Sequence, residues 1–283
     1  MDELYRIEYT FPMRNKLTDE LAICGLNAVM AAAEYHPSGI NRLFLREDRL
    51  KLFTGLCKGL AERKRPYKIC EDEELEKICK TNHHQGVVAM ILLPDVEPLS
   101  REELEEWSRE GKTGLVLHSV GNDHNLGAIV RSAAFFDTRY IIISEGDSEA
   151  RLTTSTYRIA EGGMEHVTVR SVRNTAAFLR DASSLLITIG TDLRARRRIG
   201  DLSGIVGGKQ KDSSPAAGGE LRPHGTLAAK SGLAVVLGNE EKGLPDAVKD
   251  ACSVLIRIPG TGLMESLNVA QAATIIMHRI FEL

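Results

Sequence analysis

The chain has 283 residues and a formal net charge of −3, with 43% hydrophobic and 27% charged residues. These proportions are typical of a globular protein with a substantial core, and the small total charge indicates no general affinity for polyanions. The longest apolar run, from Gly86 to Leu93, is too short to span a bilayer. The start of the chain, from Met1 to Leu4, lacks the basic and apolar regions of a signal peptide, and the five cysteines form no C-x-x-C pair. We therefore expect a cytoplasmic protein with reduced thiols, no membrane contact and no bound metal.

The first part of the chain alternates helical and extended patterns. Helices are predicted at 26–34, 51–63 and 73–80, and strands at 43–45, 67–69 and 86–93. This alternation predicts a small N-terminal α/β domain over residues 1–93. A charged linker follows at 94–112, in which Ser100 and Glu103 have the spacing of a capping box for an acidic helix that ends at Gly111.

From residue 113 to residue 283, strands and helices alternate along the whole segment. Strands are predicted at 115–117, 140–143, 167–169, 185–189, 233–237 and 254–258, and helices at 125–136, 156–161, 174–182, 247–251 and 268–281. Because most of these strands are continuously apolar, the pattern predicts a C-terminal α/β domain with a buried parallel sheet covered on both faces. Residues 192–230 interrupt it with a basic stretch and then a Gly/Ser/Pro/Ala-rich stretch, which we expect to be a flexible insertion.

The familiar nucleotide-binding motifs do not fit this chain. No G-x-G-x-x-G follows the first strand of the second domain. Gly208-Lys209 resembles part of a P-loop, but Ser203 stands at the first glycine position and Gln210 at the Ser/Thr position. Ligands of open α/β sheets bind at the carboxyl ends of the strands. Three polar, glycine-containing loops follow predicted strands at such ends, at 122–131, 238–245 and 258–268.

These three loops contain the strings N-x-G-A-I-x-R, G-N-E-x-x-G-L and S-L-N. In order and spacing, they resemble the three motifs of the SpoU/TrmH family of RNA ribose methyltransferases, within the SPOUT superfamily. In the first domain, the segments 24–29 and 84–89 resemble the ends of the substrate-binding domain that precedes some family members and binds RNA. The resemblance therefore covers both domains, except for the insertion at 192–230.

The resemblance implies a fold, a cofactor and an activity. It implies a trefoil knot in the last third of the chain, which periodicity alone does not suggest because knots are rare. It implies S-adenosyl-L-methionine as cofactor, bound in the knotted loops, and a homodimer with the active site close to the subunit interface. It implies methyl transfer to a ribose 2′-hydroxyl of structured RNA, either tRNA or rRNA.

The resemblance also assigns catalytic roles to five residues. Arg131 contacts the target phosphate; a role as general base is left open, because a guanidinium gives up its proton very weakly. Asn125 positions Arg131 or the substrate, or is simply the N-cap of its helix. Glu240 orients Asn125 or Arg131, or is a solvated turn residue. Ser266 and Asn268 contact cofactor or substrate, although Ser266 has an alternative role as a helix cap.

Cofactor binding is expected from backbone groups in the second and third loops. The residues concerned are Gly238, Asn239, Ile258 and Leu267. For Ile258 and Leu267, core packing is the alternative, and both roles are compatible in an adenine pocket read by the backbone.

RNA binding requires positive charge, and residues 42–68 contain nine basic and three acidic residues, a local charge of +6. The candidate RNA-binding residues are Arg42, Arg46, Arg63, Lys64 and Arg65, with Arg196 and Arg197 as a second group. A solvated charged face is the alternative. Aromatic residues are sparse, which favours recognition of RNA backbone and shape over stacking on single strands.

Two alternatives to an active ribose methyltransferase stay open. One is a catalytically inactive RNA-binding or ribosome-assembly factor with the same fold. Glu265 supports this alternative, because family members often carry a small residue at this position and an extra carboxylate weakens the binding of RNA phosphates. The other is a base methyltransferase of a related knotted family, although those proteins have different motifs. The sequence does not distinguish tRNA from rRNA, nor which nucleotide is modified.

Overall fold

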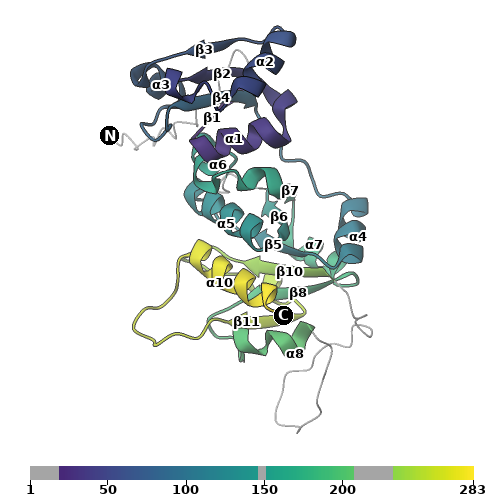
Figure 1. Ribbon diagram of the computed structural model, residues 1–283. Coiled ribbons are helices and arrows are strands. Elements are labelled where there is room, and N and C mark those ends of the chain that lie inside the picture. The colour runs from purple at the N-terminus through teal and green to yellow at the C-terminus, as the bar shows by residue number, and fades with distance from the viewer. Residues whose placement is uncertain (1–18, 146–150, 207–231) are drawn as a thin grey trace, which may run out of the picture. The chain divides into compact units, whose positions relative to one another are not determined.

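The computed structural model describes residues 19–145, 151–206 and 232–283 and divides into two compact units (Figure 1). The small unit comprises the chain up to Asp95 together with Leu152–Glu165. The large unit comprises Val96–Arg151 and His166–Leu283. In the part of the chain that is described, no helix is long and apolar enough to cross a membrane.

The small unit contains a four-stranded mixed sheet. Its strands are β1 (Glu20–Cys24), β2 (Ile40–Leu45), β3 (Tyr67–Ile69) and β4 (Val87–Leu92), and its first three helices are α1 (Leu26–Tyr35), α2 (Thr54–Glu62) and α3 (Asp72–Cys79). The strand order is β1-β4-β2-β3, with β4 antiparallel to both β1 and β2, and β3 parallel to β2. One face of the sheet packs on Leu75 and Cys79 of α3, and two more buried cysteines, Cys24 and Cys70, act there as small apolar residues.

A further helix of the small unit comes from a distant part of the sequence. Helix α6 (Thr154–Ala160) packs on β1 and α1. The Thr154 hydroxyl donates a hydrogen bond to the carbonyl oxygen of Ala22 at 2.7 Å, and the Asn27 amide donates to Glu161 at 2.9 Å. This differs from the expected division at residue 113, because local periodicity predicts a helix here without specifying the sheet on which it packs.

The large unit contains the parallel sheet that the apolar strands predict. Its strands, in spatial order, are β7 (Thr168–Val172), β6 (Thr138–Ser144), β5 (Thr113–Leu117), β10 (Gly232–Leu237), β8 (Leu186–Thr191), β11 (Val254–Arg257) and β9 (Arg197–Arg198). Every neighbouring pair is parallel. Its helices are α4 (Arg101–Glu110), α5 (Asp123–Phe135), α7 (Thr175–Ala182), α8 (Leu202–Val206), α9 (Asp246–Lys249) and α10 (Val269–Phe281). Short 3-10 helices at Pro37–Gly39, Glu47–Arg49, Gly163–His166 and Ile199–Asp201 complete the described secondary structure of both units.

The expected linker at 94–112 is part of the large unit. The capping box is confirmed, since the Glu103 backbone N–H donates to Ser100 Oγ at 3.2 Å and the Ser100 N–H donates to Glu103 Oε2 at 3.1 Å. However, Trp107 of α4 is fully buried and its ring stacks on Tyr140 with centroids 4.8 Å apart. A Cβ atom at Gly114 would lie 2.3 Å from the Trp107 ring, so only glycine fits there. This core contact makes α4 a layer of the large unit.

The expected insertion at 192–230 is ordered in its first part. Arg197 and Arg198 form strand β9, which pairs with Ile256 and Arg257 of β11 and extends the sheet by one strand. Helix α8 follows directly. Residues 207–231 lie outside the described residues, and the trefoil knot stays a prediction.

Candidate active site

The three motif loops start at one edge of the large sheet. Strands β5 and β10 are neighbours, and β11 is separated from β10 only by β8. Because all these strands are parallel, their carboxyl ends lie at the same edge. The loops after β5, β10 and β11 therefore converge there, as the sequence predicts.

A chain of side-chain hydrogen bonds links the three loops. The amide group of Asn125 donates to the Glu240 carboxylate, and the Asn125 carbonyl oxygen accepts from the Asn268 amide at 3.0 Å. The Asn268 carbonyl oxygen in turn accepts from the backbone N–H of Ala270 at 2.9 Å. Because an ionised carboxylate only accepts, the orientation of both amides follows from Glu240 at one end and the Ala270 N–H at the other. The structure thus brings together three of the five predicted catalytic residues.

Two alternative roles from the sequence are wrong. Helix α5 is capped by Asn122, whose side chain accepts from the His124 N–H at 2.8 Å, and not by Asn125. Helix α10 is capped by Asn268 and not by Ser266, which is exposed. Since Asn125 has no capping role, its amide group is available to join Glu240 to Asn268.

The loop after β10 is closed tightly on itself. The side-chain oxygen of Asn239 accepts hydrogen bonds from the backbone N–H groups of Glu241 and Lys242, at 2.9 and 3.1 Å. The side-chain NH2 group of Asn239 donates a hydrogen bond to the carbonyl oxygen of Ser119 at 3.0 Å. At Gly238, a Cβ atom would lie 2.4 Å from the carbonyl carbon of Gly243, so any other residue would open the turn. Asn239 therefore fixes this loop and ties it to the end of β5. Its predicted role, and that of Gly238, in holding the cofactor stays a prediction.

Arg131 lies six residues after Asn125 on α5 and its side chain is exposed. In an α-helix this spacing separates two side chains by about 120° around the axis. Ser132, which hydrogen-bonds Thr274 of α10 at 2.8 Å, marks the side of α5 that faces α10. Arg131 lies about 100° from Ser132 around the helix axis, and its catalytic role stays a prediction.

The loop after β11 is largely exposed. Leu267 is 44% exposed, so core packing does not explain it, whereas Ile258 is half-buried. Leu263 and Met264 are 88% and 80% exposed. This loop offers apolar side chains to a ligand or partner, and the predicted cofactor contacts of Ile258 and Leu267 are untested.

Two further groups lie at this edge without a recognisable motif in the sequence. The first is the end of β8, which lies between β10 and β11, with Asp192 paired to Lys249 at 3.2 Å. The second is His118 after β5, whose Nδ1 lies 3.0 Å from the Thr175 hydroxyl and whose pKa is lowered by burial. Only the strand order places these residues, and no local motif indicates them.

Most of the predicted RNA-binding arginines of the small unit already form ion pairs or hydrogen bonds with residues of that unit. Arg42 pairs with Glu20, and Arg46 pairs with Asp48 at 2.9 Å and Asp72 at 3.2 Å. The Arg63 guanidinium donates to the carbonyl oxygens of Gly59 and Pro37 at 3.0 and 2.9 Å, so it holds the end of α2.

The remaining basic candidates are exposed. Within the described residues, the side chains of Lys64 and Arg65 make no ion pair. Arg196 and Arg197 are exposed next to or on the edge strand β9. A group of three metal-ligating side chains does not occur among the residues described.

Comparison with known proteins agrees with this geometry. The model of the SpoU rRNA methylase family matches residues 112–278, and that of RNA 2′-O ribose methyltransferase substrate binding matches residues 22–95. The chain is 29% identical over 271 residues to the 23S rRNA (guanosine-2′-O-)-methyltransferase RlmB of Nitrosomonas europaea, covering 94% of this chain and 92% of that protein.

Two solved structures show the same fold. The AdoMet-bound rRNA methyltransferase from Sinorhizobium meliloti matches with a TM-score of 0.68 at 21% identity, covering 93% of this chain and 87% of that one. The SpoU methyltransferase AviRb from Streptomyces viridochromogenes, in complex with the cofactor AdoMet, matches with a TM-score of 0.65 at 19% identity, covering 93% and 90%. Both hold the cofactor that the sequence resemblance implies. The expected α/β fold and the family resemblance are confirmed, and the chain belongs to the SpoU rRNA methylase family.

Proposed function

We propose that this chain, an RNA methyltransferase by its family, transfers the methyl group of S-adenosylmethionine to a ribose 2′-hydroxyl of tRNA or rRNA. The observation that carries the proposal is the chain of hydrogen bonds from Glu240 through Asn125 to Asn268. It joins all three family motifs at the ligand-binding edge of the sheet.

The residues at this edge suit S-adenosylmethionine. Backbone groups at Gly238 and Asn239 lie in a closed loop, and the half-buried Ile258 and exposed Leu267 offer an apolar surface for an adenine ring. When bound, the cofactor would supply the methyl group for the ribose oxygen, and the hydroxyl proton would pass to a base, a role for which Arg131 stays an open candidate. The protein's contribution is to hold the hydroxyl in line with that group, and orientation of this kind is worth roughly 7 kcal/mol or more.

Within this proposal, Asn125, Glu240 and Asn268 are positioning residues. Each amide is held at both ends, so the first turn of α5, the loop after β10 and the start of α10 keep a fixed spacing. Arg131 contacts the phosphate of the target nucleotide. Its planar guanidinium can hold two oxygens of the target phosphate, which a lysine ammonium cannot do in the same geometry.

RNA binding outside the catalytic edge is assigned to the exposed Lys64 and Arg65, with Arg196 and Arg197 as a second group. Arg42, Arg46 and Arg63 contribute less, because their guanidinium groups already have partners within the small unit.

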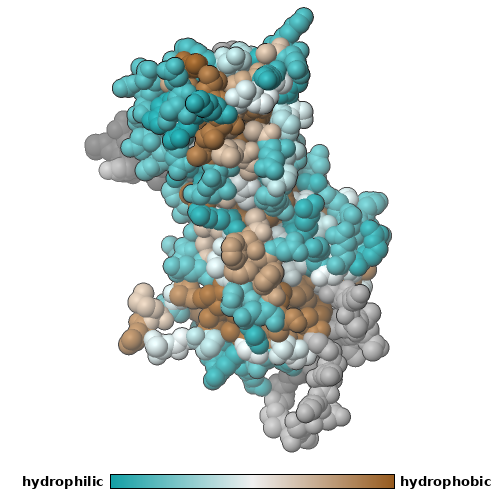
Figure 2. Space-filling model, in the orientation of Figure 1, coloured by the Kyte–Doolittle hydropathy of each residue, from teal (hydrophilic) through white to brown (hydrophobic). Residues whose placement is uncertain are grey.

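The proposed enzyme is a homodimer. Phe135 of α5 and Phe281 of α10 are 79% and 63% exposed, and Ile275 of α10 is 40% exposed. Apolar side chains gather on the face of the large unit that carries α10 (Figure 2). Large exposed apolar side chains in a cluster are typical of a surface that a partner covers. Sedimentation of the full chain tests this: a monomer at all micromolar concentrations would contradict it.

Two measurements on the full chain test the proposed activity. Calorimetric titration with S-adenosylmethionine should show binding at one site per chain. Single-turnover reaction with unmodified tRNA and rRNA should then give an RNA with a 2′-O-methyl group. A folded chain that binds RNA but not the cofactor would instead support the inactive RNA-binding factor, which Glu265 beside the third motif keeps as the second candidate.

A further inference from the structure

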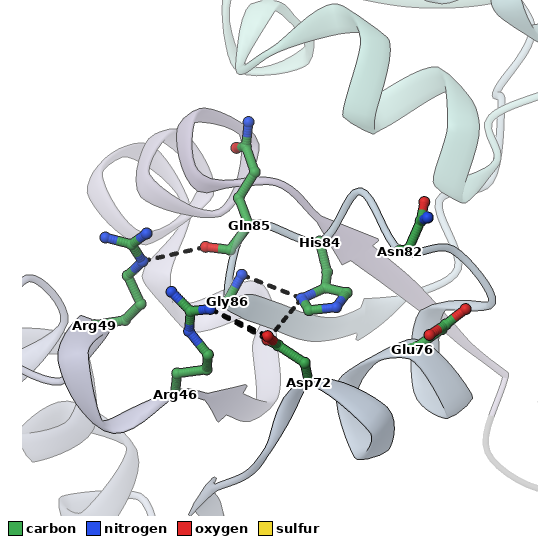
Figure 3. A pocket seen from close by; sticks show the side chains of 8 residues that line it. All are labelled: Arg46, Arg49, Asp72, Glu76, Asn82, His84, Gln85 and Gly86. Carbon is green, nitrogen blue, oxygen red and sulfur yellow. Dashed lines mark hydrogen bonds and ion pairs between the residues drawn. The ribbon is translucent and has the colours of Figure 1, made fainter.

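The small unit has a hollow of about 330 Å³ that the proposed reaction does not use (Figure 3). It lies between the end of β2, the first two turns of α3 and the turn before β4. Its lining residues are Arg46, Arg49, Asp72, Glu76, Asn82, His84, Gln85 and Gly86. Ligand pockets usually measure about 300 to 1,000 Å³, so the hollow suits one small ring system.

The turn at 84–86 that forms one wall is held rigidly. Gln85 has a φ of 52°, a conformation that costs energy for a residue with a side chain. Its side-chain oxygen accepts the Leu26 N–H at 2.6 Å, and its backbone carbonyl oxygen accepts from Arg49 at 3.2 Å. Gly86 has a φ of 80°, a backbone conformation that residues with a side chain rarely adopt. Strained turns fixed by this many interactions are typical of binding sites.

His84 provides a buried donor at the floor of the hollow. It is only 5% exposed, and its Nδ1 accepts the Gly86 N–H at 3.1 Å. Because Nδ1 accepts that hydrogen bond and lies 3.9 Å from Asp72 Oδ1, the ring nitrogen that remains for a ligand is Nε2. Figure 3 shows His84 next to Asp72, with Arg49 on one side and Glu76 and Asn82 on the other.

The charges of the hollow do not favour a phosphate. Two arginines, Arg46 and Arg49, face two carboxylates, Asp72 and Glu76, and the Arg46 guanidinium is already paired with Asp72 and Asp48. Within the described residues, the Glu76 carboxylate makes no ion pair, so it would repel an anion. Donors and acceptors both line the hollow, which suits a neutral ring with both kinds of group on its edge.

We propose that this hollow binds one unpaired RNA base and prefers guanine. Proteins that recognise RNA by sequence usually do so at unpaired bases, reading their Watson–Crick edges. The guanine edge has two adjacent N–H donors and a carbonyl acceptor. A carboxylate with two acceptor oxygens, as on Glu76, beside a donor such as Asn82 or His84, matches that edge. The inference rests on the proposed function only in taking RNA as the ligand.

Fluorescein-labelled pentaribonucleotides test the inference. The full chain, without cofactor, is titrated with UUGUU, UUAUU, UUCUU and UUUUU, and binding is followed by fluorescence anisotropy. UUGUU should bind most tightly. In Glu76→Gln, which exchanges one acceptor for a donor at the same size, UUGUU should bind at least about five-fold more weakly while UUUUU is unchanged. Because Glu76 is exposed, the variant should keep the wild-type melting temperature.

Glu73→Gln is the matched control, since Glu73 is exposed on the same helix and does not line the hollow. Equal affinity for the four pentamers in the wild-type chain would overturn the inference. A weakening shared by all pentamers, or reproduced by Glu73→Gln, would overturn it equally, because such an effect would not depend on the guanine base. Failure of the proposed function is distinguishable: it would abolish calorimetric binding of S-adenosylmethionine and leave the discrimination between pentamers intact.

Discussion

The edge of the large unit where the three motif loops meet and the hollow of the small unit are assembled differently. At this edge, hydrogen-bonded partners are separated by 115 and 143 residues, and the parallel strand order brings them together. The hollow is built from residues 46–86, around a mixed sheet and one rigid turn. The first site is recognisable from three motif strings, each attached to its own strand. The second depends on which charged side chains pair with one another, and a count of basic residues does not reveal this.

Arg131→Ala should have the largest effect on the edge where the three motif loops meet. It should reduce single-turnover methyl transfer by about 10² to 10³-fold, because it removes a preorganised charge next to the reacting ribose. Affinity for S-adenosylmethionine should be nearly unchanged, since the proposed cofactor residues all lie after residue 237. Arg131→Lys should restore little activity.

Arg180→Ala is the control, because Arg180 is an exposed helix arginine of the same unit. Near wild-type rates for Arg131→Ala would show that Arg131 is only a surface residue. The proposed active site would then be misplaced.

The next effect separates the two roles of Asn268, which caps α10 and holds Asn125. Asn268→Ala should lower the free energy of unfolding by about 0.5 to 2 kcal/mol, the usual effect of removing an N-cap. Asn268→Ser keeps a capping hydroxyl but is too short to reach Asn125. Its stability should be close to wild type, while single-turnover methylation falls roughly 10²-fold through misplaced loops. Full activity of the serine variant would show that the link to Asn125 has no catalytic role.

A smaller effect should distinguish the exposed Lys64 and Arg65 from Arg63, whose guanidinium already has hydrogen-bond partners in the small unit. Replacing Lys64 and Arg65 by glutamine should weaken RNA binding and reduce the slope of log affinity against log salt by about 0.7 to 0.9 for each phosphate that the variant no longer neutralises. Arg63→Gln should instead lower stability by about 1 kcal/mol, because its guanidinium holds two backbone carbonyl groups. If Arg63→Gln changed the salt slope as strongly as the other two substitutions, the division would be wrong.

The smallest expected effect concerns His118. Burial lowers its pKa, so the folded chain holds the neutral ring and the unfolded chain takes up a proton first as the pH falls. The free energy of unfolding should therefore decrease as the pH drops below about 6.5, the ordinary histidine value, towards the lower folded pKa. In His118→Gln this decrease should be shallower in urea denaturation measured across pH 7 to 5. His83→Gln, at an exposed histidine, should leave the wild-type slope, and equal slopes for His118→Gln and wild type would contradict the prediction.

Elements with local signals are predictable from the amino-acid sequence. Continuous apolar runs indicated the strands of the parallel sheet, because a strand covered on both faces needs no polar side. The spacing of Ser100 and Glu103 predicted the cap of α4, since both partners lie within one helical turn. The three motif strings predicted the convergence of Asn125, Glu240 and Asn268, because parallel strands end at one edge.

Which surface each element contacts depends on the packing of the whole chain and is not visible in the sequence. The periodicity of apolar residues indicates which side chains are buried but not what they pack against. For this reason the sequence predicts α6 in the large unit, whereas it packs on β1 of the small unit. The same limit applies to charge: Arg46 and Lys64 look alike in the sequence, yet one is held by two aspartates and the other is exposed. Contacts between residues far apart in the sequence depend on the order of the strands in the sheet and on competition between interactions of similar energy. Both depend on the packing of the whole chain, so a short stretch of sequence does not determine them.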